Sequence, residues 1–431
     1  MQLPSIAFLY EIFEKHPSVQ TDTRKLQLGD LYFALKGPNF NGNTFAMAAL
    51  EAGASYAIVD EVIPESSNLD NRILQVEDVL TTLQALAKHH RQQFAIPFIA
   101  ITGSNGKTTT KELVSTVLAS QYKTYTTKGN LNNHIGVPLT ILSIGKDAEM
   151  AVIEMGANHQ KEIESYCTYT LPTHGMINNC GKAHLEGFGG EAGVRKGKGE
   201  LYDSLRNNNG TAFVMSDYDY LNEMSKGIKE IITYGAITGQ TQAIAIDNNG
   251  MISVQGTKGF EERIDTQLVG TYNLPNILAA ITIGQYFKVP IAKIKAAIEG
   301  YTPTNSRSQL MHWHNNQIIL DAYNANPSSM KLAVENFAKI TSTQKIMCLG
   351  GMKELGEESL LEHQALINYI QTFNWEQVVL VGGDFKTCQH KYLYFENAKE
   401  AGQWLKAQNF SQKHILIKGS RGIQMEQMIA D

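Results

Sequence analysis

The feature that most restricts the fold of this chain is the stretch IAITGSNGKTTTKEL, from Ile99 to Leu113. An apolar run with β-branched residues, a glycine-rich loop and a helix-like segment follow one another here, which is typical of a phosphate-binding loop. The spacing departs from the usual G-x-x-x-x-G-K-[ST] form, because Ile101 occupies the position of the first glycine and the loop opens at Gly103. The stretch predicts a buried strand that leads through a phosphate loop into a helix, within an open α/β sheet.

The residues of this loop suit the binding of a nucleoside triphosphate. Backbone N–H groups from Gly103 to Lys107 can surround phosphate oxygens, and the start of the following helix adds a partial positive charge. Lys107 is expected to bridge the β- and γ-phosphates of ATP, and the Thr108 hydroxyl to bind Mg²⁺. The predicted ATP contacts of the loop are Gly103, Ser104, Asn105, Gly106, Lys107, Thr108 and Thr109. The alternative is a glycine-rich turn that binds nothing, which the agreement of strand, helix, lysine and threonine disfavours.

The pattern of the chain separates three regions. Residues 1–95 hold short strand-like runs around a helix-like stretch and predict a small α/β unit. Residues 96–305 begin with the strand before the loop and contain further buried-strand patterns, AVIEMG and GMINN, each ending in polar residues. Residues 306–431 alternate helices with strands that end in glycine, which predicts a mostly parallel, doubly wound sheet. The predicted fold class is therefore α/β with three domains.

Composition and charge exclude several classes of function. The chain has 37 basic and 42 acidic residues, and its net charge of −5 gives no reason to expect nucleic acid as a partner. No apolar run approaches the roughly 18 residues of a membrane helix, and the N-terminus lacks the pattern of a signal peptide. The four cysteines are far apart and match neither a zinc spacing nor a disulfide framework. We expect a cytoplasmic monomer without membrane insertion.

Polar side chains outside the loop add candidate metal and substrate contacts. Glu154 is the only charge in its strand pattern, and carboxylate oxygens suit Mg²⁺. His184 stands among glycines in NNCGKAHLEGFGG, where the backbone can approach a ligand closely. Lys196 and Lys198 follow in RKGKGEL, and the polar turns DAYNANPSSM and KGSRG follow later strands. On spacing alone, each of these residues also has an ordinary explanation. Glu154 can be a solvated carboxylate, His184 a structural histidine and the two lysines part of a solvated basic turn. The two polar segments can be ordinary turns, in which Asn and Pro are common.

The blocks around these residues resemble the Mur ligases. The loop TGSNGKTTT is similar to that of the Mur ligases and the folylpolyglutamate synthetases, which form amide bonds through an acyl phosphate. Within this superfamily the chain resembles, over nearly its whole length, the Mur ligases that add D-alanyl-D-alanine to UDP-MurNAc-tripeptide. The blocks that carry the resemblance are TDTRKLQLGDLYFALKGPNFNGNTF, TKGNLNNHIGVPLT, EMGANHQKEI, NNCGKAHLEGFG, YNANPSSM and KGSRG, and YNANP and GNLNNHIGVP are the most specific. The resemblance implies a UDP-substrate-binding domain (1–95), a central P-loop ATPase domain (96–305) and a C-terminal Rossmann-like domain (306–431).

The resemblance also implies roles for single residues. ATP would phosphorylate the tripeptide carboxylate and the dipeptide amine would attack the acyl phosphate, while Mg²⁺ and Lys107 offset the growing negative charge. The implied metal ligands are Thr108, Glu154, His184 and Lys198, the last as a carbamate. The implied catalytic residues are Lys107, Lys198, His184 and Arg307, and the further ATP contacts are Asn273, Asn276, Arg307 and Asp321. The implied UDP-substrate contacts are Asp22, Arg24, Asn130, Asn132 and Asn133, and the implied dipeptide contacts are Asn324 and Asn326.

Three positions depart from the pattern of the family. Tyr272 stands where histidine is usual, Leu320 replaces the first of an aspartate pair, and Gly351 stands where aspartate is usual. These departures concern the ribose side and the C-terminal loop, and they leave the phosphate loop and the metal set unchanged. Three other functions stay open: another Mur-type or folylpolyglutamate ligase, a P-loop NTPase that drives a conformational change, and a nucleotide-binding module without catalysis. The TDTR segment argues against a folylpolyglutamate ligase, and the complete loop argues against a non-catalytic module.

Overall fold

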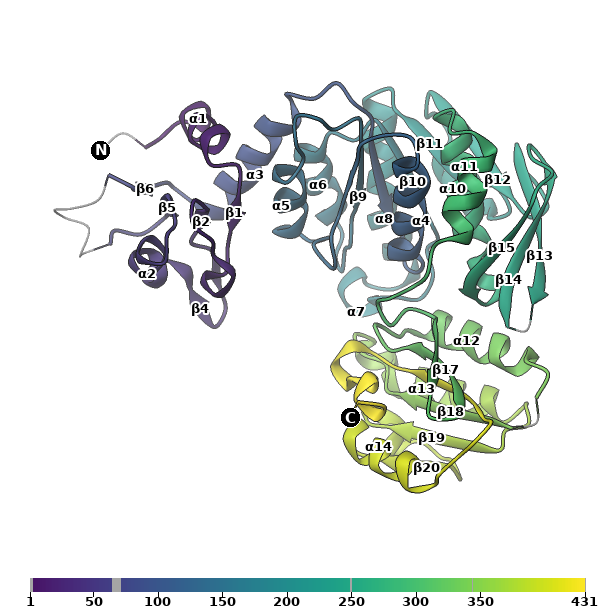
Figure 1. Cartoon of the computed structure of the whole chain (residues 1–431). Helices are drawn as coiled ribbons and strands as arrows, with labels where there is room; N and C mark the ends of the chain where they lie inside the picture. Colours follow the sequence, from purple (N-terminus) through teal and green to yellow (C-terminus); the bar gives the residue numbers. More distant parts are fainter. Residues whose placement is uncertain (1–2, 64–70, 249, 343, 431) are drawn as a thin grey trace. The chain divides into compact units, whose positions relative to one another are not determined.

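A computed structural model describes residues 3–63, 71–248, 250–342 and 344–430 (Figure 1). These residues form two compact units, and each is described by itself. The first unit is drawn from residues 1–100, 122–156 and 162–174, and the second from residues 101–121, 157–161 and 175–431. No helix in the described part of the chain is long and apolar enough to cross a membrane.

The first unit contains a small sheet with helices near the N-terminus, consistent with the small α/β unit expected there. Four strands are hydrogen-bonded in the order β1-β2-β5-β6, and every pairing is parallel. The strands are β1 (Val19–Gln20), β2 (Leu31–Phe33), β5 (Tyr56–Val59) and β6 (Ile73–Gln75). The helices are α1 (Ile6–Lys15), α2 (Ala46–Glu51) and α3 (Val79–Arg91), and a hairpin joins β3 (Lys36–Gly37) to β4 (Phe40–Asn41).

The first unit also holds one side of the central sheet. Strand β9 (Met150–Glu154) pairs in parallel with β8 (Thr124–Thr126) and lies beside the start of β7 (Phe98–Thr102). All five residues of β9 are buried, as expected for a parallel strand that is covered on both faces. Glu154 therefore reaches the carboxyl end of the sheet as a buried charge. The helices on this side are α5 (Gly136–Leu142) and α6 (Glu162–Thr170).

The second unit holds the other side of the central sheet, in the order β15-β14-β13-β12-β11-β10, with β10 beside the end of β7. The strands β11, β12 and β13 are parallel, in line with the mostly parallel sheet expected for this region, but β13, β14 and β15 form an antiparallel extension that we did not predict. Burial alternates along β15, so one of its faces is solvated. The strands are β10 (His174–Ile177), β11 (Thr211–Met215), β12 (Glu230–Gly235), β13 (Thr241–Asn248), β14 (Met251–Lys258) and β15 (Arg263–Val269). The helices are α4 (Lys107–Ala119), α7 (Leu185–Phe188), α8 (Glu191–Asn207), α9 (Asp219–Ser225), α10 (Leu274–Tyr286) and α11 (Ile291–Glu299).

A six-stranded sheet forms the C-terminal part of the second unit. Its order is β16-β17-β21-β18-β19-β20, and only the β16–β17 pairing is antiparallel. Alternate residues of β18 enter two separate cores, one shared with α12 and α13 and the other with α14. Helices therefore cover both faces, which confirms the predicted doubly wound sheet. The elements are β16 (Gln309–Trp313), β17 (Asn316–Asp321), α12 (Pro327–Lys339), β18 (Lys345–Gly350), α13 (Ser359–Ile370), β19 (Gln377–Val381), β20 (Leu393–Phe395), α14 (Ala398–Ala407) and β21 (His414–Lys418).

Candidate active site

The phosphate loop joins β7 to α4, and two of its glycines have backbone angles that other residues avoid. Gly103 has φ +147° and Gly106 has φ +80°. Gly106 also has no room for a side chain, because a Cβ there would lie 2.6 Å from Asn276 Oδ1. Helix α4 begins directly afterwards at Lys107, so the positive end of its dipole lies at the loop.

Lys107 lies folded over its own loop. Its Nζ donates to the carbonyl of Gly103 at 2.7 Å and to that of Ser104 at 3.4 Å. A phosphate oxygen at the loop would offer the ammonium a stronger, charge-assisted hydrogen bond than these neutral carbonyls do. Thr108 is buried in the first turn of α4, with 4 % of its surface exposed, and Thr109 beside it is half-buried.

The amides of Ser104 and Asn105 have protein partners that the sequence did not indicate. Ser104 N donates to the carbonyl of Asn179 at 2.9 Å, and Asn105 N donates to Asn179 Oδ1 at 3.0 Å. Asn179 Nδ2 donates in return to the carbonyl of Asn105 at 3.2 Å. We expected every N–H group from Gly103 to Lys107 to face phosphate. In this structure two of them hold the loop against the segment after β10, so phosphate binding would centre on the start of α4.

The two asparagines predicted on the adenine side lie in a buried amide network. Asn276 Oδ1 accepts from Thr110 Oγ1 at 3.0 Å and from Asn178 Nδ2 at 3.1 Å. Asn276 Nδ2 donates to Asn273 Oδ1 at 2.8 Å, and Asn273 Nδ2 donates to the carbonyl of Val269 at 2.8 Å. The network ties α10 to α4 next to the loop, and contact of either asparagine with adenine stays a prediction.

The segment Asn178–His184, which we call the junction segment, contacts both the loop and the C-terminal sheet domain. On the loop side, Ser104 Oγ donates to a carbonyl of the segment at 2.9 Å. On the other side, Lys182 N donates to Ser328 Oγ of α12 at 3.2 Å, and Lys182 Nζ donates to Glu362 of α13 at 2.7 Å. The predicted phosphate site is therefore held together with the first two helices of the C-terminal domain.

His184 also has a C-terminal partner. Its Nδ1 lies 2.5 Å from Glu354 Oε2, and this close contact, aided by the nearby charge of Lys107, holds the pKa of Glu354 below its usual range. Both His184 and Glu354 have left-handed backbone, with φ of +52° and +63°, a strained conformation that clusters at functional sites. Because Nδ1 faces a carboxylate, Nε2 is the nitrogen that a metal would use.

Lys198 lies on α8 and is buried, with 1 % of its surface exposed. Its Nζ donates to the carbonyl of Ala157 at 3.0 Å and lies 4.9 Å from the centroid of the Phe188 ring. Burying an ammonium costs free energy unless polar groups pair with it, and the Ala157 carbonyl is one such partner. Lys196 is exposed. The difference in burial supports Lys198 over Lys196 as the predicted carbamate.

In the first unit, Glu154 is paired with one of the predicted UDP-substrate asparagines. Asn132 Nδ2 donates to Glu154 Oε1 at 2.8 Å, and Glu154 is 1 % exposed. Asn133 Oδ1 accepts from Gly136 N at 2.8 Å at the start of α5, while Asn130 is exposed. Asn132 thus orients a carboxylate that is predicted to bind metal, a role that the sequence did not indicate.

Asp22 and Arg24 form a two-bond ion pair on the 3₁₀ turn Thr23–Lys25. The Nη2–Oδ2 and Nε–Oδ1 distances are both 2.8 Å, and Arg24 N donates to Asp22 Oδ1 at 3.1 Å. The hydrogen bonds from Arg24 lower the pKa of Asp22 to about 2. The Arg24 side chain is 86 % exposed, so a substrate phosphate could exchange with the carboxylate.

Arg307 and Asp321 have separate partners in the C-terminal domain. The guanidinium carbon of Arg307 lies 3.8 Å from the centroid of the Tyr323 ring. Asp321 Oδ2 lies 2.5 Å from Lys418 Nζ, and its Oδ1 accepts from Ser308 N at 3.2 Å. The strand register explains the ion pair, because Asp321 and Lys418 are opposite each other at the carboxyl ends of β17 and β21.

The structure shows the surroundings of the three residues that depart from the family's pattern, Tyr272, Leu320 and Gly351. The hydroxyl of Tyr272 lies 2.6 Å from Ser308 Oγ, and burial raises the pKa of Tyr272. Leu320 packs in the C-terminal core. A Cβ at Gly351 would lie 2.7 Å from Gly383 Cα, so an aspartate there would require the backbone at 383 to move.

The two predicted dipeptide contacts precede α12. Asn324 Oδ1 accepts from Ala325 N at 2.9 Å. Asn326 is the N-cap of α12 and is 7 % exposed. Its Nδ2 donates to Asn105 Oδ1 at 2.8 Å, so this residue contacts the phosphate loop.

Within the described ranges, no group of three or more His, Cys, Asp and Glu side chains is arranged to hold a metal ion. The predicted metal set is of a different kind, because it includes a lysine carbamate and a threonine hydroxyl. The residues of the second unit fit it, since Lys198 is buried and His184 is oriented by a carboxylate.

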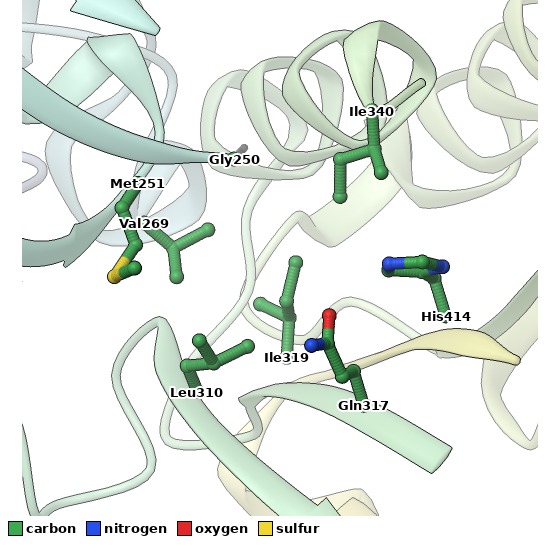
Figure 2. Close-up of a pocket in the computed structure, with 8 residues that line it drawn as sticks. All are labelled: Gly250, Met251, Val269, Leu310, Gln317, Ile319, Ile340 and His414. Atoms are coloured by element: carbon green, nitrogen blue, oxygen red, sulfur yellow. The ribbon is translucent and has the colours of Figure 1, made fainter. Parts of the chain in front are cut away.

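A small apolar cavity lies elsewhere in the second unit (Figure 2). Its volume is about 10 Å³, which is room for roughly one water molecule. Met251 and Val269 of the central sheet and Leu310 and Ile319 of the C-terminal sheet are among its lining residues. None of the predicted site residues lines it, so it is not the predicted nucleotide site.

Sequence reasoning missed Asn179 and Glu354, which contact predicted site residues. Asn179 lies in NNCGKAHLEGFGG, where only the histidine drew attention, and Glu354 lies in LGGMKELG, where only Gly351 did. The available signal was their position, because both follow the end of a strand, β10 or β18, where binding groups gather in open α/β sheets.

The fold and the site define a class of protein: an α/β enzyme with a phosphate loop on a mostly parallel sheet and a doubly wound domain hydrogen-bonded to that loop. Three family models match the chain: Mur ligase family, catalytic domain, at residues 17–91; Mur ligase middle domain, at 101–284; and Mur ligase, glutamate ligase domain, at 306–421. The chain belongs to the Mur ligase family, which confirms the resemblance of its motifs.

Individual relatives match almost end to end. The UDP-N-acetylmuramoyl-tripeptide–D-alanyl-D-alanine ligase of Bacillus subtilis is 32 % identical over 428 residues, covering 96 % of this chain and 92 % of the relative. The enzyme of the same name from Escherichia coli is 34 % identical over 424 residues, with coverage of 96 % and 92 %. A crystal structure of MurF from Acinetobacter baumannii has a TM-score of 0.87 at 30 % identity, again covering 96 % and 92 % of the two chains.

Proposed function

We propose that this protein is an ATP-dependent ligase that joins D-alanyl-D-alanine to UDP-N-acetylmuramoyl-tripeptide, a step in the synthesis of peptidoglycan precursors. The names of the two relatives state this substrate pair, and the similarity extends over nearly the full length. The structural observation that carries the proposal is the hydrogen bond between Asn105 and Asn326, which joins the phosphate loop to the YNANP segment. A ligase must bring a phosphoryl donor and an acceptor amine to one carboxylate, and this contact brings together the segments proposed to hold them.

The proposed reaction has two balanced steps. The γ-phosphoryl group of ATP passes to an oxygen of the tripeptide carboxylate, which gives ADP and an acyl phosphate. The dipeptide nitrogen attacks the acyl carbon and loses a proton, and inorganic phosphate leaves with the electrons of the broken C–O bond. Lys107 would move from the Gly103 carbonyl to the transferred phosphoryl group, whose charge it stabilises.

We propose that Thr108, Glu154, His184 and Lys198, the last as a carbamate, hold Mg²⁺. When bound, Mg²⁺ neutralises charge on the phosphate oxygens. The support is the chemistry of the donors: Lys198 and Glu154 are buried at 1 % exposure each, and Glu354 fixes the orientation of His184.

Further roles follow the same proposal. The domains would comprise residues 1–95, 96–305 and 306–431, with Asp22 and Arg24 at the UDP-substrate and Arg307 and Asp321 reaching ATP from the C-terminal side. The remaining proposed contacts are Asn130, Asn132 and Asn133 for the UDP-substrate, Asn273 and Asn276 for ATP, and Asn324 and Asn326 for the dipeptide. The enzyme would act as a monomer in the cytoplasm, where ATP and UDP-linked precursors occur.

The test is phosphate release with MgATP and UDP-MurNAc-tripeptide, with the product identified by mass spectrometry. We expect release to require D-alanyl-D-alanine, because a site built to pair with a dipeptide leaves polar groups unpaired when a smaller acceptor binds. Single D-alanine or L-glutamate should give little. Equal release with L-glutamate would favour a folylpolyglutamate ligase, and ATP turnover without any acceptor would favour an NTPase.

A further inference from the structure

Asn105 makes three hydrogen bonds to the side-chain amides of Asn179 and Asn326. Its backbone N and carbonyl bond to the side chain of Asn179 at 3.0 and 3.2 Å, and its Oδ1 accepts from Asn326 at 2.8 Å. The middle of the phosphate loop is thus connected directly to a residue 221 positions later in the chain.

The orientation of the Asn326 amide is fixed by the helix that it caps. Its Oδ1 accepts from Ser329 N at 2.9 Å, and Ser329 Oγ is 3.1 Å from Asn326 N, which completes a capping box. A backbone N–H requires an oxygen as its acceptor, so the Nδ2 end must face the loop. Asn105 must in turn present its oxygen, and the polarity of the bond is determined without ambiguity.

We propose that Asn326 is a positioning residue that couples occupancy of the phosphate loop to the first turn of α12. A nucleotide that orders the loop would, through Asn105, also order the cap of α12, and with it the polar segment Asp321–Asn326 where the acceptor is proposed to bind. One amide hydrogen of Asn326 serves this bond and the second stays for the acceptor. The inference rests on the proposed function only in requiring that the loop binds a nucleotide.

The phosphate loop and the first turn of α12, which the proposal couples, are also connected through the junction segment. The junction segment holds α12 through Ser328 and α13 through Glu362, so we expect these contacts to persist when the single Asn105–Asn326 bond is removed. A substitution at Asn326 should therefore change communication between the two segments without separating them.

The experiment is hydrogen exchange by mass spectrometry on the full chain, with and without MgADP. In the unchanged protein, MgADP should slow exchange at residues 107–110 and also at residues 329–331, the latter roughly 2- to 10-fold, the range expected for one neutral hydrogen bond. N326S keeps a good N-cap but is too short to reach Asn105, so it should keep the first response and lose the second. N326A loses both the N-cap and the hydrogen bond to Asn105. Comparing N326A with N326S therefore separates the effect of the cap from that of the Asn105–Asn326 bond.

A conservative variant provides the rescue. In N326D one carboxylate oxygen can cap α12 and the other can accept from Asn105 after its amide turns over, so the response at 329–331 should return. The inference is overturned if α12 does not respond in the unchanged protein, or if N326S responds as fully as the unchanged protein does. Absence of any response at 107–110 would contradict nucleotide binding, and with it both the proposed function and the coupling.

Discussion

Replacing Lys198 by alanine tests the proposed carbamate most directly. The side chain is 1 % exposed and packs beside Phe188, so its removal leaves a cavity that should cost about 2–4 kcal/mol of stability, the range for truncating a large buried side chain. If the side chain supplies an anionic metal ligand, turnover should also fall by about 10²–10³, the size typical of losing one preorganised electrostatic group. The loss of turnover should therefore exceed what the remaining folded fraction explains.

The structure supplies a matched control two residues away. Lys196 lies on the same helix but is exposed, so K196A should stay within about 0.5 kcal/mol in stability and keep normal turnover. The assay is phosphate release by both variants at a temperature where each is folded, repeated with added acetate or formate. A small carboxylate can enter the vacated space and restore part of the activity of K198A, because it replaces the missing oxygen ligand. Intact mass under gentle conditions should show one added CO₂ in the unchanged protein and not in K198A.

Two results would refute this reasoning. Full activity in K198A combined with loss of activity in K196A would place the modified lysine at the exposed position. Failure of every small carboxylate to restore K198A, together with an unmodified mass in the unchanged protein, would mean that Lys198 acts as an ammonium or only packs against its neighbours.

K107A should remain folded by circular dichroism and lose at least about 100-fold in turnover, because the loop loses its only lysine; near-normal turnover would remove this residue from the mechanism. K418A should cost about 3–5 kcal/mol, because Asp321 would keep a poorly solvated charge without its partner, and the K418M/D321N double variant should recover part of the loss. Urea unfolding followed by tryptophan fluorescence suits this test, because all three tryptophans lie in residues 306–431; an unchanged midpoint would contradict it. Arg24 holds the pKa of Asp22 at about 2, below the roughly 3.9 of an unfolded chain, so the contribution of the pair is present above about pH 4 and is lost as the pH falls towards 2. In an NMR titration the carboxyl of Asp22 should return to an ordinary pKa in R24A, and an unchanged titration would exclude the ion pair in solution.

The fold could be predicted wherever local patterns decide it. The strand before Gly103, the helix from Lys107 and the glycine-ended strands of the C-terminal sheet all follow from continuous apolar runs and turn residues. The antiparallel strands β13–β15 were missed because they extend the edge of a sheet whose other strands are parallel, and only tertiary pairing reveals that.

The sequence predicted which residues belong to the candidate site, but it did not predict which residues they contact. Asn276 was chosen for adenine, yet its amide is engaged with Thr110 and Asn178, which are 166 and 98 positions away in the chain. The pair formed by Glu354 and His184 is likewise set by the packing of distant segments. No local pattern contains such information, because the partner is specified by the fold.

The resting position of Lys107 has a consequence for selectivity among anions. An anion that binds the Lys107 ammonium must first displace two carbonyl partners, and this exchange offsets part of what the charge-assisted hydrogen bond contributes. A polyphosphate can compensate for that exchange, because it also meets the amides at the start of α4 and the Thr108 hydroxyl. We therefore expect the loop to bind a polyphosphate in preference to free inorganic phosphate, the product released in each cycle of the proposed reaction.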